Sequence, residues 1–191
     1  AYASLYELRV STDGGVTWED PVTLRRDESP NVLNDKNTMT ADPNDSDFVY
    51  AIWDRLVSPP GEAAPPRAFE NSVAFRGPVL FARTSDGGDT WEPAREIFRP
   101  GTIAQTIGNQ IVVLPDNAQF DGELLGNHTG TIGWGVSIDG GRTWVDGGGP
   151  PVGGPVISWS SDPVVAVDAK SGWFYLCALA IGTGSSNSIA V

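Results

Sequence analysis

Basic residues and long apolar runs are scarce in this sequence of 191 residues. Its 24 acidic residues outnumber the 12 Lys and Arg, of which only Lys36 and Lys170 are lysines, and the formal net charge is −12. A chain this acidic repels the phosphates of nucleic acids and the surfaces of anionic membranes. No stretch of about 18 apolar residues is present, so no transmembrane helix is expected. We therefore expect no nucleic-acid partner and no membrane insertion.

Cysteine and histidine are each present only once. Cys177 lies in the apolar run FYLCALA, which predicts a buried thiol rather than a nucleophile. His128 lies in the turn-like GNHTG, so a solvated loop position is expected and no zinc-ligand cluster is visible. The acidic run 42–47, DPNDSD, lacks the remaining ligands of an EF-hand loop and predicts a turn. We expect neither a metal nor a cofactor.

Glycine and proline are abundant by contrast, with 23 and 15 copies, and short apolar runs alternate with turn residues. This composition predicts an all-β fold. One pattern, Ser/Thr-x-Asp-Gly-Gly-x-Thr-Trp, occurs three times, at 11–18, 84–91 and 137–144. Its aspartate can accept backbone N–H bonds, its glycines permit positive φ, and its tryptophan can cover a hairpin. The residues concerned are Asp13, Trp18, Asp86, Trp91, Asp139 and Trp144.

A second repeat alternates with the first. The segments 34–53, 108–125 and 161–179 each read as strand, Asp-containing turn and strand, with Asp42, Asp116 and Asp168 in the turns. The chain then divides into a half unit at 1–27, a whole unit at 32–100 with a long loop at 55–78, a whole unit at 104–152 and a half unit at 157–191. These are about three four-stranded units.

The first pattern resembles the Asp-box, or BNR repeat, of sialidase-like β-propellers. The runs NDKNTMTADP, FVYAIWDR and TIGNQIVVLPD are similar to those of bacterial exo-α-sialidase-like proteins. The resemblance implies four-stranded antiparallel blades in a six-bladed ring, Asp-box turns that are structural, and an extracellular or cell-surface location. Since about three blades are present, we expect either the remainder of a longer chain or a second copy to close the propeller.

Candidate site residues stand where the first strand of each unit begins, because propeller ligands gather at that end of the channel. Asp35 and Asp162 are the predicted catalytic carboxylates, and the alternative is that each caps a strand start. Arg55 is the candidate arginine for a substrate carboxylate. The long loop is predicted to be a lid or a solvated insertion. The predicted substrate-binding residues are Lys36, Arg67, Glu70, Asn109 and Gln110.

Two functions remain open from the sequence. The resemblance implies a secreted glycoside hydrolase acting on terminal sialic acid or a related sugar through an arginine triad, an acid/base Asp and a Tyr–Glu pair. The chain has no Arg-Ile-Pro segment and no identifiable Tyr–Glu pair, and Tyr50 and Tyr175 are predicted to pack in the core. The alternative is a non-catalytic carbohydrate-binding, adhesive or structural propeller. The expected partner is a glycan or another small sugar ligand, although an acidic channel in the second case would also suit a cation or a basic partner.

Overall fold

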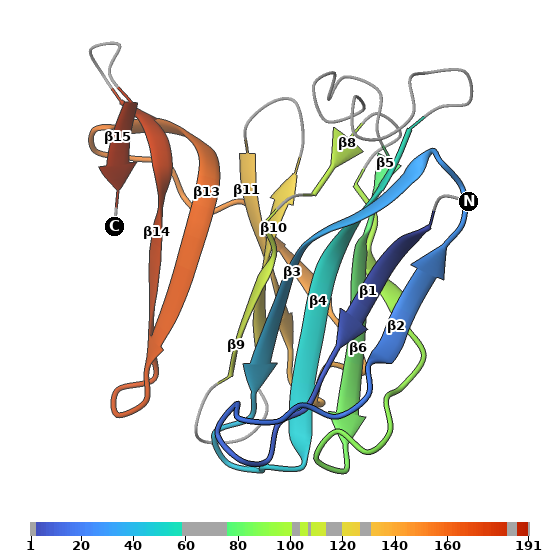
Figure 1. Ribbon diagram of the computed structural model, residues 1–191. Coiled ribbons are helices and arrows are strands. Elements are labelled where there is room, and N and C mark those ends of the chain that lie inside the picture. The colour runs from blue at the N-terminus through green and yellow to red at the C-terminus, as the bar shows by residue number, and fades with distance from the viewer. Residues whose placement is uncertain are drawn as a thin grey trace.

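A computed structural model describes residues 3–58, 76–100, 104–106, 108–113, 120–126, 131–182 and 187–190 (Figure 1). These residues form strands and turns, and none of them lies in a helix that could cross a membrane. The strands are β1 (Ser4–Leu8), β2 (Val22–Asp27), β3 (Val32–Ala41), β4 (Phe48–Val57), β5 (Arg76–Gly77), β6 (Val79–Ser85), β7 (Arg95–Phe98), β8 (Ala104–Gln105), β9 (Gln110–Val113), β10 (Phe120–Gly126), β11 (Thr131–Ser137), β12 (Val145–Gly148), β13 (Val156–Asp168), β14 (Trp173–Gly182) and β15 (Asn187–Ala190).

The strands form four sheets whose order in space follows the chain (Figure 1). Strands β1 and β2 pair, β3, β4, β6 and β7 pair antiparallel in succession, β9 to β12 do the same, and β13 to β15 form the last sheet. Short β5 extends the second sheet by pairing with β4 and with β8. The predicted all-β class is therefore confirmed, and the described sheets form an open array rather than a closed ring.

The second sheet separates two apolar clusters because neighbouring residues of a strand point to opposite faces. Tyr50, Ile52 and Phe81 face the third sheet and pack with Ile111 and Val113. Ala51, Trp53 and Leu80 face the first sheet and pack with Tyr6, whose ring lies edge-on to Trp53 at 4.5 Å between centroids. Both faces of the sheet are thus buried between neighbouring sheets.

The three Ser/Thr-x-Asp-Gly-Gly-x-Thr-Trp segments form tight turns with the hydrogen bonds that the pattern predicts. Asp13 Oδ1 accepts the backbone N–H groups of Val16 and Thr17, and Asp13 Oδ2 accepts the Thr17 hydroxyl at 2.6 Å. Asp86 and Asp139 bind the threonine four residues later in the same way. These bonds hold the pKa of each aspartate near 2, so the carboxylates serve the turns.

Three expectations about side chains and loops need correction. Strand β4 continues to Val57, so residues 55–57 belong to a strand and not to the long loop; residues 59–75 lie outside the described part. Tyr50 is buried, as predicted, but Tyr175 is 47% exposed because no described sheet covers that face of β14. Cys177 is only half-buried for the same reason. His128 and Asp116 lie outside the described residues.

Candidate functional site

The first strands of the second and fourth sheets share a distortion, near the start of β3 and in the middle of β13. In β3, Lys36 and Asn37 bulge opposite a single residue of β4, and in β13 Asp162 and Pro163 bulge in the same way opposite β14. Lys36 has φ 49° and Asp162 φ 54°, and these are the only non-glycine residues with positive φ in the described structure. In front of β9, Gly108 has φ 73°. Left-handed backbone at non-glycine residues is strained and is concentrated at functional sites.

Strand direction places the start of β3 at the end of the array away from the Asp-Gly-Gly turns. The turns that join β1 to β2 and β6 to β7 lie at the lower end in Figure 1, whereas β4 ends and β3 begins at the upper end. Thr38 donates its hydroxyl to Asn109 O at 2.9 Å, and Gln110 Oε1 accepts the Val165 N–H at 3.3 Å. These bonds connect β3 to the β9 segment and β9 to β13. The first strands of neighbouring sheets are therefore held side by side.

Asp35 and Asp54 are directly opposite each other in the β3–β4 pair. Their side chains consequently project from the same face of the sheet, toward the third sheet. Asp54 is fully buried, and Asp35 is half-buried. Oxygen Oδ2 of Asp35 is buried and has no hydrogen-bond partner among the described residues. A buried carboxylate oxygen without a donor is costly and requires an explanation in a native structure.

Asp54 is surrounded by neutral donors. Its carboxylate accepts the Thr106 hydroxyl at 2.7 Å, the Gly108 N–H at 2.9 Å and the Asn109 side-chain amide. Burial raises the pKa of Asp54 to about 7; the three hydrogen bonds oppose this, and the charge of Asp35 adds to it. The Thr106 hydroxyl also lies 2.9 Å from Gly77 O. Because a hydroxyl has one hydrogen, Thr106 can donate it to Gly77 O when Asp54 is neutral, and then accepts a hydrogen bond from the Asp54 carboxyl group.

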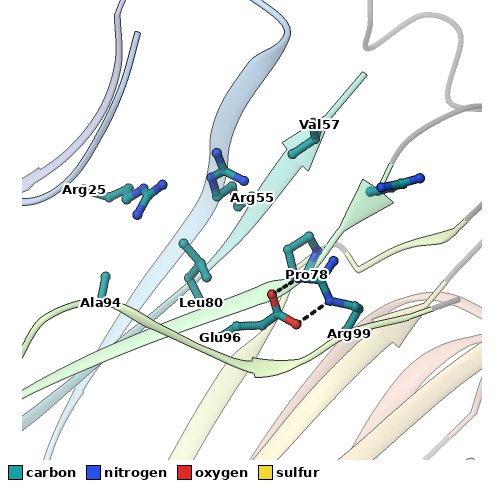
Figure 2. A pocket seen from close by; sticks show the side chains of 9 residues that line it. Arg25, Arg55, Val57, Pro78, Leu80, Ala94, Glu96 and Arg99 are labelled. Carbon is teal, nitrogen blue, oxygen red and sulfur yellow. Dashed lines mark hydrogen bonds and ion pairs between the residues drawn. The ribbon is translucent and has the colours of Figure 1, made fainter. Parts of the chain in front are cut away.

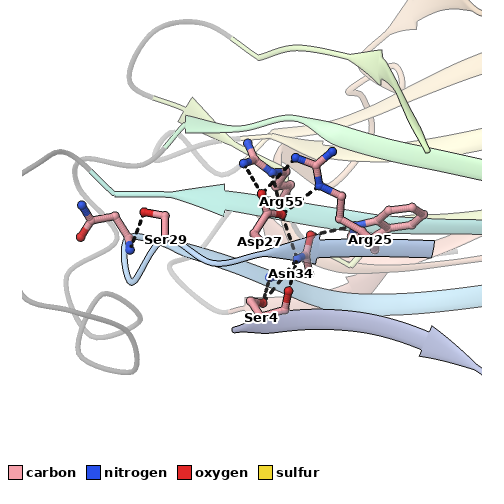
Figure 3. A network of polar contacts seen from close by, with 8 residues as sticks. Ser4, Arg25, Asp27, Ser29, Asn34 and Arg55 are labelled. Atoms are coloured by element: carbon pink, nitrogen blue, oxygen red, sulfur yellow. Dashed lines mark hydrogen bonds and ion pairs between the residues drawn. The ribbon is translucent and has the colours of Figure 1, made fainter. Parts of the chain in front are cut away.

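Asp27, at the end of β2, is bound by Arg25 of its own strand and by Arg55 of β4, between the first and second sheets (Figure 3). Arg55 binds both carboxylate oxygens at 2.6 and 3.0 Å, and Arg25 binds both at 3.0 Å. Asn34 donates a further hydrogen bond at 3.2 Å. Burial alone would raise the pKa of Asp27, but the bonds from Arg55, Arg25 and Asn34 hold it far below its usual range. Asp27 therefore stays ionised.

The predicted site residues consequently fall into separate groups. Asp35 points toward the third sheet, whereas Arg55 points toward the first sheet and is occupied by Asp27, so these two do not meet on one ligand. Lys36 is exposed at its bulge, Asn109 is buried against Asp54, and Gln110 joins two strands. Asp162 is exposed at the equivalent bulge of β13. Arg67 and Glu70 lie outside the described residues.

A pocket of about 360 Å³ opens beside the Asp27 cluster, and the sequence did not predict it. Its wall includes Arg25, Arg55, Arg76 and Arg99, with Pro78 and Leu80 as an apolar side. Figure 2 shows Arg25 and Arg55 on one side of the pocket and the Glu96–Arg99 ion pair on the other. The residues come from β2, β4, β5, β6, β7 and the segment after β7, so no local sequence pattern joins them. Among the described residues, no group of three or more His, Cys, Asp or Glu could hold a metal.

Comparison with known proteins identifies the fold and nothing finer. No protein-family model matches the sequence, and no curated protein matches it significantly. A solved structure described as "NanB plus Optactamide" is similar to this chain, with a TM-score of 0.58 and 9% sequence identity over 95% of this chain. The chain spans 46% of that structure's length. Because the identity is so low, the likeness shows a shared fold alone.

Proposed function

We propose that this chain is part of a sialidase-like β-propeller that hydrolyses terminal acidic sugars, with its ligand face where β3, β9 and β13 begin. In this proposal the four described sheets are blades, and the rest of a six-bladed ring comes from further chain or a second copy. The single observation that supports the proposal is the environment of Asp35. Its carboxylate lies beside a strained bulge and has a buried oxygen with no partner in the described structure.

The chemistry follows from the pairing of Asp35 with Asp54. A glycosidase needs a carboxyl group that can give a proton to the leaving oxygen and take it back. Asp35 is half-buried and forms no ion pair with any described residue, so it is available for that exchange. Asp54 is fully buried and cannot touch a sugar, but its charge state changes the field at Asp35. We assign Asp35 the acid/base role and Asp54 a positioning role.

The structural comparison supports this proposal at the level of fold. NanB is a sialidase, and its structure resembles nearly all of this chain. Sialidases act on glycans, so a glycan ligand is proposed here as well. An extracellular or cell-surface location is part of the same proposal. Its test is the fractionation of producing cells into medium, surface and interior.

The test is turnover of a fluorogenic sialoside by the full-length protein between pH 4 and 8. We expect hydrolysis, with kcat lowered at least about 100-fold by Asp35→Asn, because general acid–base groups contribute about 10²–10⁴-fold. Asp162→Asn tests the second predicted carboxylate in the same assay. Asp89→Asn is the matched control, since Asp89 is exposed in a turn at the far end of β6. Absence of turnover by a folded wild-type protein would refute hydrolysis.

A second candidate is a non-catalytic propeller that binds glycans. One observation favours it: β3, β9 and β13 contain no arginine, so in the described structure no guanidinium stands on the first strands beside Asp35. A sialic acid carboxylate normally calls for such groups. Binding of a glycan without turnover, unaffected by Asp35→Asn, would select this candidate.

A further inference from the structure

We propose that the pocket lined by Arg25, Arg55, Arg76 and Arg99 is a binding site for an anionic group, a carboxylate or sulfate, carried by a sugar-sized molecule. We call it the arginine pocket. It lies on the face of the second sheet that is turned toward the first sheet, whereas Asp35 projects from the other face. It is therefore separate from the candidate catalytic site.

The charge balance of the arginine pocket is the first argument. Four of the ten arginines in a chain of net charge −12 gather there. The carboxylates available to them are Asp27, which both Arg25 and Arg55 bind, and Glu96, which Arg99 binds. Two positive charges remain without a counter-charge in the described structure. Like charges held this close repel one another, and an anion removes that cost.

Unused donors are the second argument. Arg25 and Arg55 bind Asp27 through Nε and Nη2, so Nη1 of each arginine has no acceptor among the described residues. Arg99 likewise binds Glu96 through Nε and Nη2, and its Nη1 has no acceptor in the described part of the chain. Arg76 is exposed and has no acceptor in the part that is described. A guanidinium presents paired N–H groups that match the oxygens of carboxylate and sulfate.

Shape and lining define the rest of the ligand. A volume of about 360 Å³ lies within the range of small-molecule pockets, about 300–1,000 Å³. Val57, Pro78, Leu80 and Ala94 provide an apolar wall against which a sugar ring can lie. The preference for an anion follows from the arginines alone. The further claim that a sugar carries this anion rests on the proposed function.

The decisive experiment is calorimetric titration of the full-length protein with glucuronate, glucose 6-sulfate and glucose at low salt. We expect at least one of the two acids to bind and glucose not to bind. Whichever acid binds more tightly identifies carboxylate or sulfate as the preferred group. Affinity should fall as NaCl rises from 0.05 to 0.5 M, since the rim arginines are exposed and screened. Binding of neither acid would overturn the proposal.

Variants assign the binding to this pocket. The double variant Arg76→Ala, Arg99→Ala removes two exposed rim guanidiniums and should weaken binding at least about tenfold. The matched control is Arg26→Ala, which removes an exposed arginine next to Arg25 that does not line the pocket. Unchanged affinity in the double variant would overturn the proposal.

The same samples separate this proposal from the proposed function. Asp35→Asn should lower kcat for sialoside hydrolysis at least about 100-fold while glucuronate or sulfate binding remains. If hydrolysis is absent but acid binding depends on Arg76 and Arg99, the anion site stands and the hydrolase does not. If acid binding instead depends on Asp35 and not on the rim arginines, the ligand occupies the candidate catalytic site and the arginine pocket is refuted.

Discussion

Asp27 and Asp54 are both buried aspartates at interfaces of the second sheet, yet their surroundings set opposite charge states. Asp27 is held by two arginines and an amide, and its pKa is far below the usual range. Asp54 is held by a hydroxyl, a backbone N–H and an amide, and its pKa is about 7. The two environments meet at consecutive residues of β4, because Asp54 points to one face and Arg55 to the other.

The difference shows that burial alone does not decide whether a carboxyl group keeps its proton. Desolvation favours the neutral acid at both sites, and the partners decide the outcome. Charged donors outweigh desolvation at Asp27, whereas neutral donors do not at Asp54. The face of the second sheet that is turned toward the first sheet therefore offers fixed positive charge for an anion. The face turned toward the third sheet has a carboxyl group, Asp54, whose proton titrates near neutrality.

The largest expected effect is the loss of Arg55. Arg55→Ala leaves the buried Asp27 carboxylate with Arg25 and Asn34 among the described residues, and we expect the free energy of unfolding to fall by about 3–5 kcal/mol. Urea unfolding of the full-length protein measures this. Adding Asp27→Asn to Arg55→Ala should restore part of the loss, because the uncompensated charge is removed. A loss below about 1 kcal/mol would mean that Arg55 does not hold Asp27.

The next effect is a pH dependence caused by Asp54. Its native pKa of about 7 lies above the ordinary value of 3.8, so the unfolded chain releases this proton before the native state does. The stabilisation is complete below pH 4 and is lost as pH rises to 7, by at most about 4 kcal/mol. Asp27 acts in the opposite sense, and its contribution is lost as pH falls below about 4.

Asp54→Asn isolates this contribution. Asparagine is neutral at every pH, so the fall in stability between pH 4 and 7 should be smaller than in the wild type. Thermal unfolding at pH 4, 5.5 and 7 measures the slope. Identical slopes in the two proteins would show that Asp54 is ionised throughout this range, as Asp27 is.

A smaller effect tests the packing on the Asp54 face. Gly141 and Gly15 are the second glycines of equivalent turns, with φ 74° and 89°. A Cβ on Gly141 would lie 2.5 Å from Phe81, whereas the nearest atom to one on Gly15 is 3.7 Å away, on Trp18. Both alanine variants incur about 1 kcal/mol of left-handed strain. Gly141→Ala should lose about 1–3 kcal/mol more through overpacking, as measured by urea unfolding. Equal losses would mean that the turn at residues 137–144 does not pack closely against Phe81.

The smallest effect is expected for Arg26, the neighbour of Arg25 in β2. Its ion pair with Glu28 is exposed, with side-chain exposures of 57% and 73%. Surface ion pairs contribute about 0–1 kcal/mol. Arg26→Ala should change the free energy of unfolding by less than 1 kcal/mol, and a loss as large as that of Arg55→Ala would remove the distinction between buried and exposed arginines.

The sequence predicted the turns because their chemistry is local. Each turn aspartate binds groups within four residues, so the pattern alone contains the partners. Asp27 and Asp54 could not be found in this way, since Arg55 and Asn109 lie 28 and 55 residues away from them. The pairing of Asp35 with Asp54 depends on strand register, and the pattern did not include it. The blade division and the catalytic roles remain predictions.

The most direct test of the contrast between the two faces is a ¹³C NMR titration of the aspartate carboxyl groups in the full-length protein. Asp27→Asn and Asp54→Asn assign the two signals. We predict that Asp54 titrates with a midpoint near pH 7 and that Asp27 remains ionised down to pH 3. If both carboxyl groups titrate near pH 4, the two faces do not hold aspartate in different states, and the proton proposed to tune Asp35 is absent.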